Sequence, residues 1–193
     1  MAKIARDSLL TLEAYAKARA GFRAQVIAHK KRRTVHLGDH VTLLFEDELT
    51  MRYQVQEMLR IERIFEQEGI DDELAAYNPL VPDGSNLKAT MLIEYDDADE
   101  RKTALAAMKG IEDDVWIGVD GHARAKAIAD EDMERENADK TSSVHFLRFE
   151  LTPAMIAALK EGAPMTVGVD HAYFRAEATL DAATRAALVA DFD

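Results

Sequence analysis

The clearest pattern along this chain is a helical stripe of apolar residues between residues 47 and 69. The members of the stripe are Met51, Val55, Met58, Leu59 and Phe65. At 100° per residue they share one side, which predicts an amphipathic helix over this range. Glu62 falls in the middle of the stripe, three or four residues from apolar neighbours. Because an unpaired buried carboxylate is costly, we expect Glu62 to be paired, protonated, bound to a metal or less buried than the stripe implies.

The rest of the chain mixes helical and extended patterns. Apolar periodicity and capping residues predict further helices at residues 8–33 (hinged near Gly21), 71–77, 98–109, 153–162 and 181–190. Alternating apolar residues predict strands at 87–95 and 143–151 and hairpins at 34–46, 115–128 and 166–180. Residues 130–142 are polar with almost no apolar anchors, so they are the best candidate for a mobile loop.

These patterns predict an α+β fold rather than a doubly wound parallel sheet, because strands joined in local hairpins are antiparallel. We expect a largely antiparallel sheet built from hairpins, with N-terminal, central and C-terminal helices packed on it. At 193 residues, the chain is expected to form a single domain, residues 1–193. Within it, a helical N-terminal segment (1–33) precedes an α+β body (34–193).

Composition and charge argue against several functional classes. The chain has no cysteine, which removes disulfides, thiolate nucleophiles and cysteine-held zinc or iron–sulfur sites. The net charge of −12 argues against a general nucleic-acid binder and against docking on an anionic membrane. Because neither a signal-peptide pattern nor a membrane-spanning apolar run is present, we expect a cytoplasmic location.

Signature motifs of several enzyme classes are missing. The sequence holds no phosphate-binding glycine loop, no G-x-S-x-G elbow and no H-E-x-x-H zinc helix. Asp130-Glu131-Asp132 resembles the start of a calcium loop, but the required glycine and the terminal glutamate spacing are absent. The sequence therefore identifies neither a metal nor a cofactor.

Two histidine-containing or basic clusters have ordinary explanations. His36 and His40 have the spacing of helical metal ligands, but a hairpin that pairs Leu37 with His40 turns the two imidazoles to opposite faces. The basic run at residues 29–33 could grip RNA or a cofactor phosphate. It also complements the negative end of a helix dipole, which is the favoured explanation.

The densest group of chemically capable side chains lies on the helix at 47–69 and at the end of the strand before it. Its members are Glu46, Gln56, Glu57, Arg60 and Glu62. One interpretation is a carboxylate-lined pocket that acts as a metal or cation site or as an acid–base pair. The other is a solvated face of ion pairs, with Glu62 held by an arginine or a backbone amide from another element.

Arg148 and His171 extend this candidate site. Arg148 lies beside apolar residues on one face of the strand 143–151, so we hypothesise that it is the partner of a buried Glu62. His171 ends a strand, where a histidine acts as a proton carrier or ligand, or as a turn residue with a satisfied hydrogen bond. The resulting candidate pocket consists of Glu46, Gln56, Glu57, Arg60, Glu62, Arg148 and His171.

Several short segments recur together in one bacterial family. They are FRAQVIAHK at 22–30, LLFE at 43–46, QEMLRIER at 56–63, AYNPL at 76–80, AT at 89–90 and GVDH at 168–171. In this order they resemble an uncharacterised bacterial family, a domain of unknown function that spans essentially the whole chain. The family has no established activity and no known catalytic residues to carry over. Its genes often neighbour genes for rubrerythrin-like proteins and iron–sulfur oxidoreductases, so the resemblance implies a role in redox or peroxide metabolism.

We therefore expect a non-enzymatic accessory or binding protein of cytoplasmic redox or oxidative-stress metabolism. The expected partner is a rubrerythrin-like protein or an iron–sulfur oxidoreductase, and the expected oligomer is a homodimer, with no nucleic-acid or membrane partner. The alternative is a metal- or cofactor-dependent enzyme that uses a carboxylate-rich pocket on the helix at 47–69.

Overall fold

The structure is a computed structural model that describes residues 3–131, 133, 135–137 and 139–192. The α-helices in these residues are α1 (Leu12–Lys30), α2 (Glu48–Glu62), α3 (Gln67–Tyr77), α4 (Ala98–Ala107), α5 (Pro153–Lys160) and α6 (Ala182–Val189). The 3-10 helices are η1 (Arg6–Ser8), η2 (Asn78–Leu80) and η3 (Ile111–Asp114). The strands are β1 (Thr34–Leu37), β2 (Val41–Glu46), β3 (Asn86–Ile93), β4 (Val115–Val119), β5 (Ala125–Lys126), β6 (Ile128–Ala129), β7 (Val144–Glu150), β8 (Met165–Asp170) and β9 (Arg175–Thr179).

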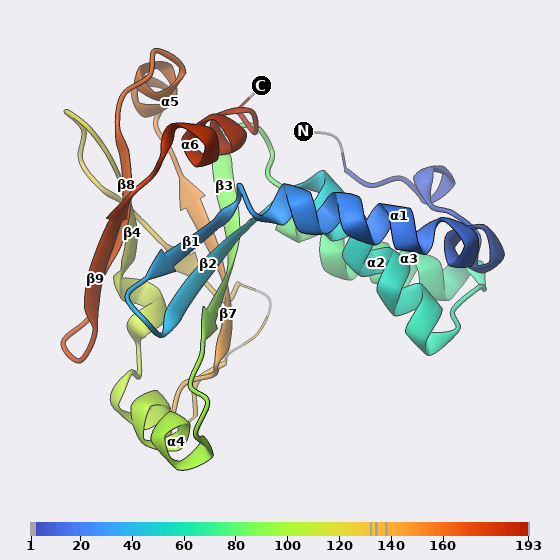
Figure 1. The fold of residues 1–193 in the computed structure, drawn as a ribbon, viewed down its shortest axis with the longest axis horizontal. Coiled ribbons are helices and arrows are strands. Elements are labelled where there is room, and N and C mark those ends of the chain that lie inside the picture. The colour runs from blue at the N-terminus through green and yellow to red at the C-terminus, as the bar shows by residue number, and fades with distance from the viewer. Residues whose placement is uncertain (1–2, 132, 134, 138, 193) are drawn as a thin grey trace.

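The strands form two antiparallel sheets that share one apolar core (Figure 1). Sheet A has the order β1-β2-β3-β7-β6, and sheet B has the order β5-β4-β8-β9. The inner face of β3 carries Leu87, Ala89 and Met91, as the alternation in the sequence predicts. The chain crosses from sheet B to sheet A at Ala127, between β5 and β6. The predicted α+β class is therefore confirmed.

The predicted hairpins at 34–46, 115–128 and 166–180 correspond to the pairs β1–β2, β4–β5 and β8–β9. In the first pair Leu37 lies opposite Val41, so the predicted pairing of Leu37 with His40 is wrong by one residue. The loop has three residues rather than two and begins at Gly38, whose φ of +59° suits a glycine. The ring of His36 lies near Thr42 across the strand pair, and the ring of His40 contacts the carbonyl oxygen of residue 94.

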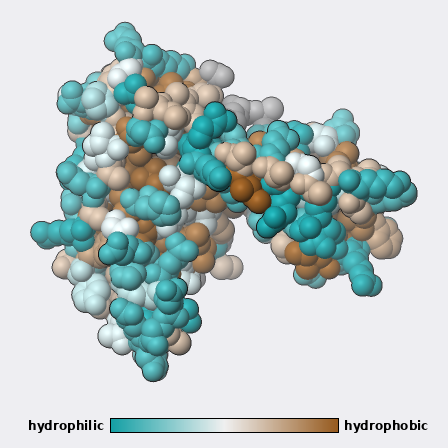
Figure 2. Space-filling model, in the orientation of Figure 1, coloured by the Kyte–Doolittle hydropathy of each residue, from teal (hydrophilic) through white to brown (hydrophobic). Residues whose placement is uncertain are grey.

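Helices α1, α2 and α3 pack on one another and extend away from the sheets as a helical arm (Figures 1 and 2). A second apolar cluster holds the arm together, and its buried members are Ile4, Met51, Val55, Leu59, Leu74 and Val81. Helix α1 runs unbroken through Gly21, where a hinge was predicted. Helices α4, α5 and α6 instead close the two ends of the sheet core. In the described part of the chain, no helix combines the length and apolar character that a membrane crossing requires.

The helix predicted at 47–69 ends earlier, at Glu62, and the next helix, predicted at 71–77, already begins at Gln67 as α3. Asp47 starts α2 with a capping box, in which its carboxylate and the Thr50 hydroxyl each accept a backbone N–H of the other residue at 2.9 Å. The helix ends at Glu62 because Arg63 adopts the left-handed conformation, with φ of 55°. Phe65 is therefore outside the helix and 70% exposed. Glu62 is exposed too, so the expectation that the stripe buries this carboxylate is wrong.

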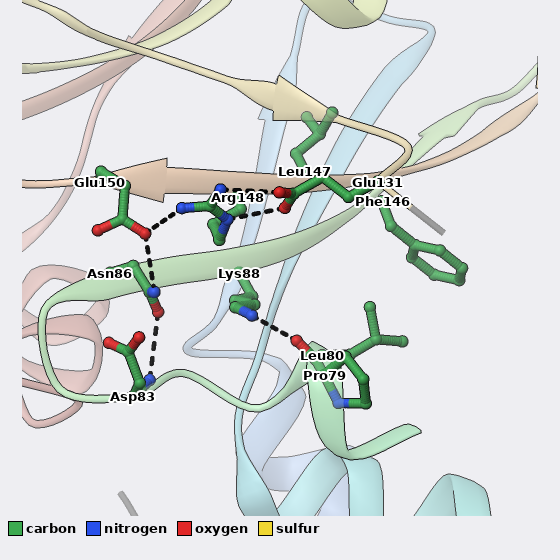
Figure 3. Close-up of a pocket in the computed structure, with 10 residues that line it drawn as sticks. All are labelled: Pro79, Leu80, Asp83, Asn86, Lys88, Glu131, Phe146, Leu147, Arg148 and Glu150. Atoms are coloured by element: carbon green, nitrogen blue, oxygen red, sulfur yellow. Dashed lines mark hydrogen bonds and ion pairs between the residues drawn. The ribbon is translucent and has the colours of Figure 1, made fainter. Parts of the chain in front are cut away.

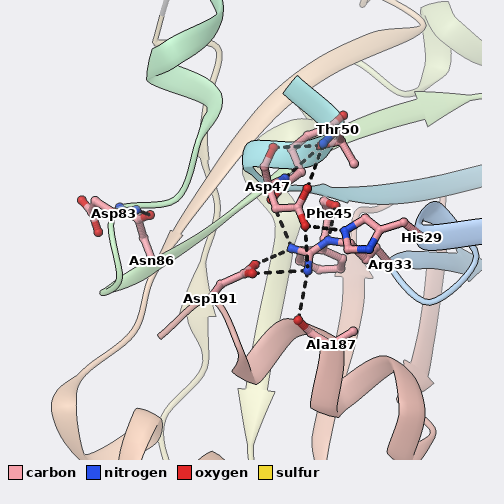
Figure 4. A network of polar contacts seen from close by, with 10 residues as sticks. His29, Arg33, Phe45, Asp47, Thr50, Asp83, Asn86, Ala187 and Asp191 are labelled. Atoms are coloured by element: carbon pink, nitrogen blue, oxygen red, sulfur yellow. Dashed lines mark hydrogen bonds and ion pairs between the residues drawn. The ribbon is translucent and has the colours of Figure 1, made fainter. Parts of the chain in front are cut away.

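Arg33 joins the helical arm to the sheets (Figure 4). Its side chain follows α1 and is 1% exposed. Its hydrogen bonds reach the end of β2 and helix α6, where the acceptors are the carbonyl oxygens of Phe45, Glu46 and Ala187 and the carboxylate of Asp191. The guanidinium also lies 3.5 Å from the carboxylate of Asp47, which contacts His29 in turn. One buried cation thus holds three segments that are distant in sequence.

We predict that Arg33→Met lowers the free energy of unfolding by about 3–5 kcal/mol, because it leaves buried carboxylates and carbonyls without their donor. The matched control is Arg32→Met, since Arg32 is the exposed neighbour; it should change stability by less than about 0.5 kcal/mol. Urea denaturation of both variants measures the difference. Equal stabilities would contradict the role given to Arg33.

We also predict opposite effects of two Gly→Ala substitutions. Gly168 lies directly opposite Trp116 in sheet B, and a Cβ at this position would lie 2.3 Å from the tryptophan ring. Gly168→Ala should therefore cost about 1–3 kcal/mol by overpacking. Gly21 is exposed in α1, with no heavy atom within 4 Å of a new Cβ. Gly21→Ala should instead stabilise the protein by about 0.5–1 kcal/mol, and thermal unfolding of the two variants checks both signs.

Candidate functional site

Glu57 ties α2 to α1. Arg19 donates two hydrogen bonds to its carboxylate, at 2.7 and 2.8 Å, and the Tyr15 hydroxyl donates a third at 2.7 Å. Arg60, one turn along α2, lies 3.3 Å away. The hydrogen bonds from Arg19 lower the pKa of Glu57 to about 2, and those from Tyr15 and Arg60 act in the same direction against the effect of burial. This carboxylate is a fixed anion in an interhelical contact.

The other predicted pocket residues near α2 do not converge on one cavity. Gln56 is buried, and its side-chain amide accepts from the backbone N–H of Leu10 and donates to the carbonyl oxygen of the same residue, at 2.7 and 3.2 Å. Glu46 is buried on the outer face of sheet A, where the Thr90 hydroxyl donates to its Oε1 at 2.6 Å. Its Oε2 has no hydrogen-bond partner among the described residues. Because Glu62 is exposed, the predicted carboxylate pocket does not form.

Arg148 lies in a groove of about 490 Å³ on the outer face of sheet A (Figure 3). It binds Glu131 with two hydrogen bonds, at 2.7 and 2.8 Å, and also contacts Glu150. The hypothesis that it is the partner of Glu62 is therefore wrong. Its neighbour across the strands is Lys88, whose pKa is lowered by burial and by the charge of Arg148. Because the Lys88 ammonium donates to the Pro79 carbonyl, the cations of this groove are already engaged by the protein.

His171 is a turn residue with satisfied hydrogen bonds, one of the two interpretations given above. Its Nδ1 accepts from the backbone N–H of Tyr173 at 3.2 Å. Its Nε2 lies 3.1 Å from the carbonyl oxygen of Lys109 and must donate to it, since a carbonyl only accepts. Both ring nitrogens therefore hold backbone groups, and His171 does not join the carboxylates of α2.

A cluster around His145, which sequence reasoning did not select, has the geometry of a ligand site. His145 is fully buried on the inner face of β7. Its Nδ1 lies 2.6 Å from the carboxylate of Asp130, and its Nε2 lies 3.0 Å from both the Thr141 hydroxyl and the carbonyl oxygen of Ser142. The carboxylate of Glu112, in η3, lies 3.9 Å from Nε2 and 3.4 Å from the Thr141 hydroxyl. Two carboxylates, a hydroxyl and a carbonyl thus surround one imidazole.

The segment predicted to be a mobile loop supplies much of this cluster. Asp130 adopts a left-handed conformation, with φ of 49°. It exchanges two hydrogen bonds with the backbone of Phe146, one through its own N–H at 2.9 Å and one through its carboxylate at 3.0 Å. At the other end of the segment, the N–H of Thr141 donates to the carbonyl oxygen of Leu105 at 3.1 Å. The described ends of the segment are therefore anchored around His145.

A cavity of about 380 Å³ opens beside the cluster, and Glu112, Asp130, Arg135 and Glu136 are among the residues that line it. The arrangement offers two kinds of chemistry. The imidazole and the carboxylates could hold a cation, or Asp130 and His145 could pass a proton. The one signal in the sequence was a histidine in the apolar alternation of β7, where Leu147 and Phe149 share its face.

The far end of the helical arm carries a pocket of different character. Its volume is about 350 Å³, and its apolar lining consists of Leu9, Leu10, Leu12, Leu59, Ile64, Phe65 and Ile70. Two of these side chains are strongly exposed, Leu10 at 42% and Phe65 at 70%. Large apolar side chains gathered at one exposed place are typical of an interaction surface.

Comparison with known proteins places the chain in a family. Residues 3–192 match the model of a family described as a protein of unknown function, DUF3501. The chain belongs to this family. A crystal structure of a novel protein of unknown function from Burkholderia pseudomallei K96243 is similar to this DUF3501 chain, with 58% sequence identity, a TM-score of 0.94 and 100% of each chain covered. No curated protein matches the chain.

We predict that Glu57 makes the stability of this DUF3501 chain depend on pH. Its folded pKa of about 2 lies below the ordinary value of 4.5. A group whose pKa is lower in the folded than in the unfolded chain stabilises the fold at pH values above its unfolded pKa. This contribution is lost as the pH falls toward the folded pKa of about 2. Glu57→Gln should therefore lower the free energy of unfolding at neutral pH by about 2 kcal/mol. The penalty should shrink as the pH falls.

Chemical denaturation at several pH values measures this difference. The control is Glu13→Gln, which removes only an exposed pair with Lys17; its stability profile should follow that of the native chain. A Glu57→Gln profile parallel to the native one would contradict the assignment.

Proposed function

We propose that the protein is a non-enzymatic accessory protein of cytoplasmic redox metabolism that binds a partner protein through the end of its helical arm. The partner class is a rubrerythrin-like protein or an iron–sulfur oxidoreductase. The observation that carries the binding role is the apolar pocket beside Phe65. The redox assignment rests on the family resemblance and accords with a chain that has no cysteine to hold a cluster of its own.

The position of the pocket suits the docking of a partner. It lies where α1 begins, α2 ends and α3 begins, at the end of the arm that is distant from the sheets (Figure 1). A partner can therefore reach it without displacing part of the fold. Phe65 is a large aromatic side chain with most of its surface in water, and such residues dominate the binding energy of protein interfaces when they become buried.

The alternative of a metal- or cofactor-dependent enzyme has less support, because the polar residues of α2 on which it depended have other roles. Glu57 holds Arg19, Gln56 holds the backbone of Leu10, and Glu62 points to solvent. Their positions are explained by the packing of the arm. The binding role is therefore the function that the geometry supports best.

The test is co-purification from the native cell, followed by titration of the purified partner. We expect the native chain to retain a rubrerythrin-like or iron–sulfur protein, and we expect Phe65→Glu to weaken that binding by roughly 30-fold or more, the loss typical of a hot-spot residue. Tyr173→Glu is the matched control, because Tyr173 is an aromatic residue with 56% exposure on the turn between β8 and β9. Its binding should equal that of the native chain.

Sedimentation of the same proteins separates the expected partner from self-association. A native chain that binds no protein of either class, or a Phe65→Glu chain that binds as well as the native one, would overturn the proposal. A dimer that Phe65→Glu alone dissociates would assign the pocket to a second copy of this chain instead.

A further inference from the structure

We propose that the His145 cluster is a binding site for a divalent transition-metal ion. His145 Nε2, the Glu112 carboxylate, the Thr141 hydroxyl and the Ser142 carbonyl oxygen are the ligands, and Asp130 orients the imidazole. The proposal is independent of the docking role of the arm, because α1, α2 and α3 contribute none of these atoms.

The distances from His145 Nε2 to the other three donor atoms suit one small ion. Ligands that lie about 2.1 Å from a metal and at right angles to each other are about 3.0 Å apart. Nε2 is 3.0 Å from the Thr141 hydroxyl and 3.0 Å from the Ser142 carbonyl oxygen. Glu112 Oε2, at 3.9 Å from Nε2 and 3.4 Å from the hydroxyl, can close the remaining side at a wider angle.

The supply of protons in the cluster also favours a cation. The carbonyl of Ser142 and the carboxylate of Glu112 only accept hydrogen bonds, and the Thr141 hydroxyl has one proton to donate. Glu112 is 8% exposed, and its contact with Thr141 is long at 3.4 Å. Without a cation, these oxygens depend on that one proton and on a proton at Nε2. A metal ion would satisfy all four donors at once.

Asp130 supplies the second element of a metal site. Because a carboxylate only accepts, the contact of 2.6 Å requires a proton on Nδ1 of His145, so Nε2 is the nitrogen that would bind a metal. In the metal-free chain Nε2 donates a proton to the Ser142 carbonyl, and a metal ion would take the place of that proton. A carboxylate that holds the other ring nitrogen is the usual partner of a metal-bound histidine. The left-handed conformation of Asp130 and its two hydrogen bonds to Phe146 fix the direction of this carboxylate.

The surroundings give an ion a route that is lined by more carboxylates than cations. The adjoining cavity is lined by Glu112, Asp113, Asp130 and Glu136, while Arg135 lies 3.7 Å from Asp130 and Lys109 lies 3.5 Å from Glu136. One nitrogen with three oxygens is a donor set for a first-row divalent ion such as Zn²⁺ or Mn²⁺, whereas Mg²⁺ prefers oxygen ligands and water.

Equilibrium dialysis of the full, tag-free, chelator-treated chain against Zn²⁺ alone, and then Mn²⁺ alone, tests the site. We expect one ion per chain. We expect Asp130→Asn, which keeps the shape of the side chain, to weaken binding by about 10- to 100-fold. Glu112→Gln should weaken it at least as much. The control is His171→Gln, because His171 is a buried histidine held by backbone groups alone, and binding should be unchanged.

A second readout needs no variant and so does not depend on altered chains folding. The ¹⁵N chemical shift of His145 Nε2 in the native protein should change when Zn²⁺ is added, while the shifts of His171 should not. The proposal is overturned if no metal binds, if Zn²⁺ binds without moving the Nε2 shift, or if Glu112→Gln and Asp130→Asn bind as tightly as the native chain. In each case the cluster would be a network of buried hydrogen bonds that holds the end of β7.

Discussion

The buried guanidinium of Arg33 fixes how the two halves of this molecule are joined. Arg33 ends the turn that follows α1, and its guanidinium accepts no hydrogen bond. It must therefore be surrounded by acceptors once it leaves water. The fold provides them from the end of β2, the start of α2 and helix α6. Because a planar guanidinium donates in fixed directions, satisfying it sets the angle at which α1 and α2 leave the sheets. The basic run at residues 29–33, which the sequence explained by the helix dipole, contains this buried residue.

That junction determines where exposed apolar surface is left. The arm has its own apolar cluster, and Glu57 and Gln56 bind its helices together without help from the sheets. Its far end therefore receives no cover from the body, and Phe65 stays in water. The apolar residues of the sheets, by contrast, are covered, because the inner faces of the two sheets and three helices enclose them. Among the described residues of the His145 cluster, Glu112 on η3 and Asp130 line the cavity beside it.

The sequence was sufficient for the elements and the class of fold, and insufficient for the site. Alternation in β3 and turn residues such as Gly38 are local signals, so strands and hairpins followed from them. Helix α2 ends where Arg63 adopts the left-handed conformation, which periodicity cannot reveal. The prediction therefore extended the helix too far and placed Glu62 within a buried apolar stripe, although it is exposed. Arg148 was predicted to pair with Glu62 because it is a charge beside apolar residues. Its partners are instead Glu131, in a loop, and Glu150, on the same strand.

His145 shows why a site of this kind escapes a reading of local pattern. On β7 it occupies an inward position that a hydrocarbon would fill, and nothing nearby in sequence marks its partners as close. Glu112 is separated from His145 in sequence by the strand pair β4–β5. Asp130 is separated from it by the polar segment that was predicted to be mobile. The polar composition of this segment has a structural reason, since Asp130 and Thr141 direct their polar atoms toward the imidazole of His145. The described ends of a polar segment without apolar anchors can thus be held by a buried polar group, and the side chains at those ends surround that group.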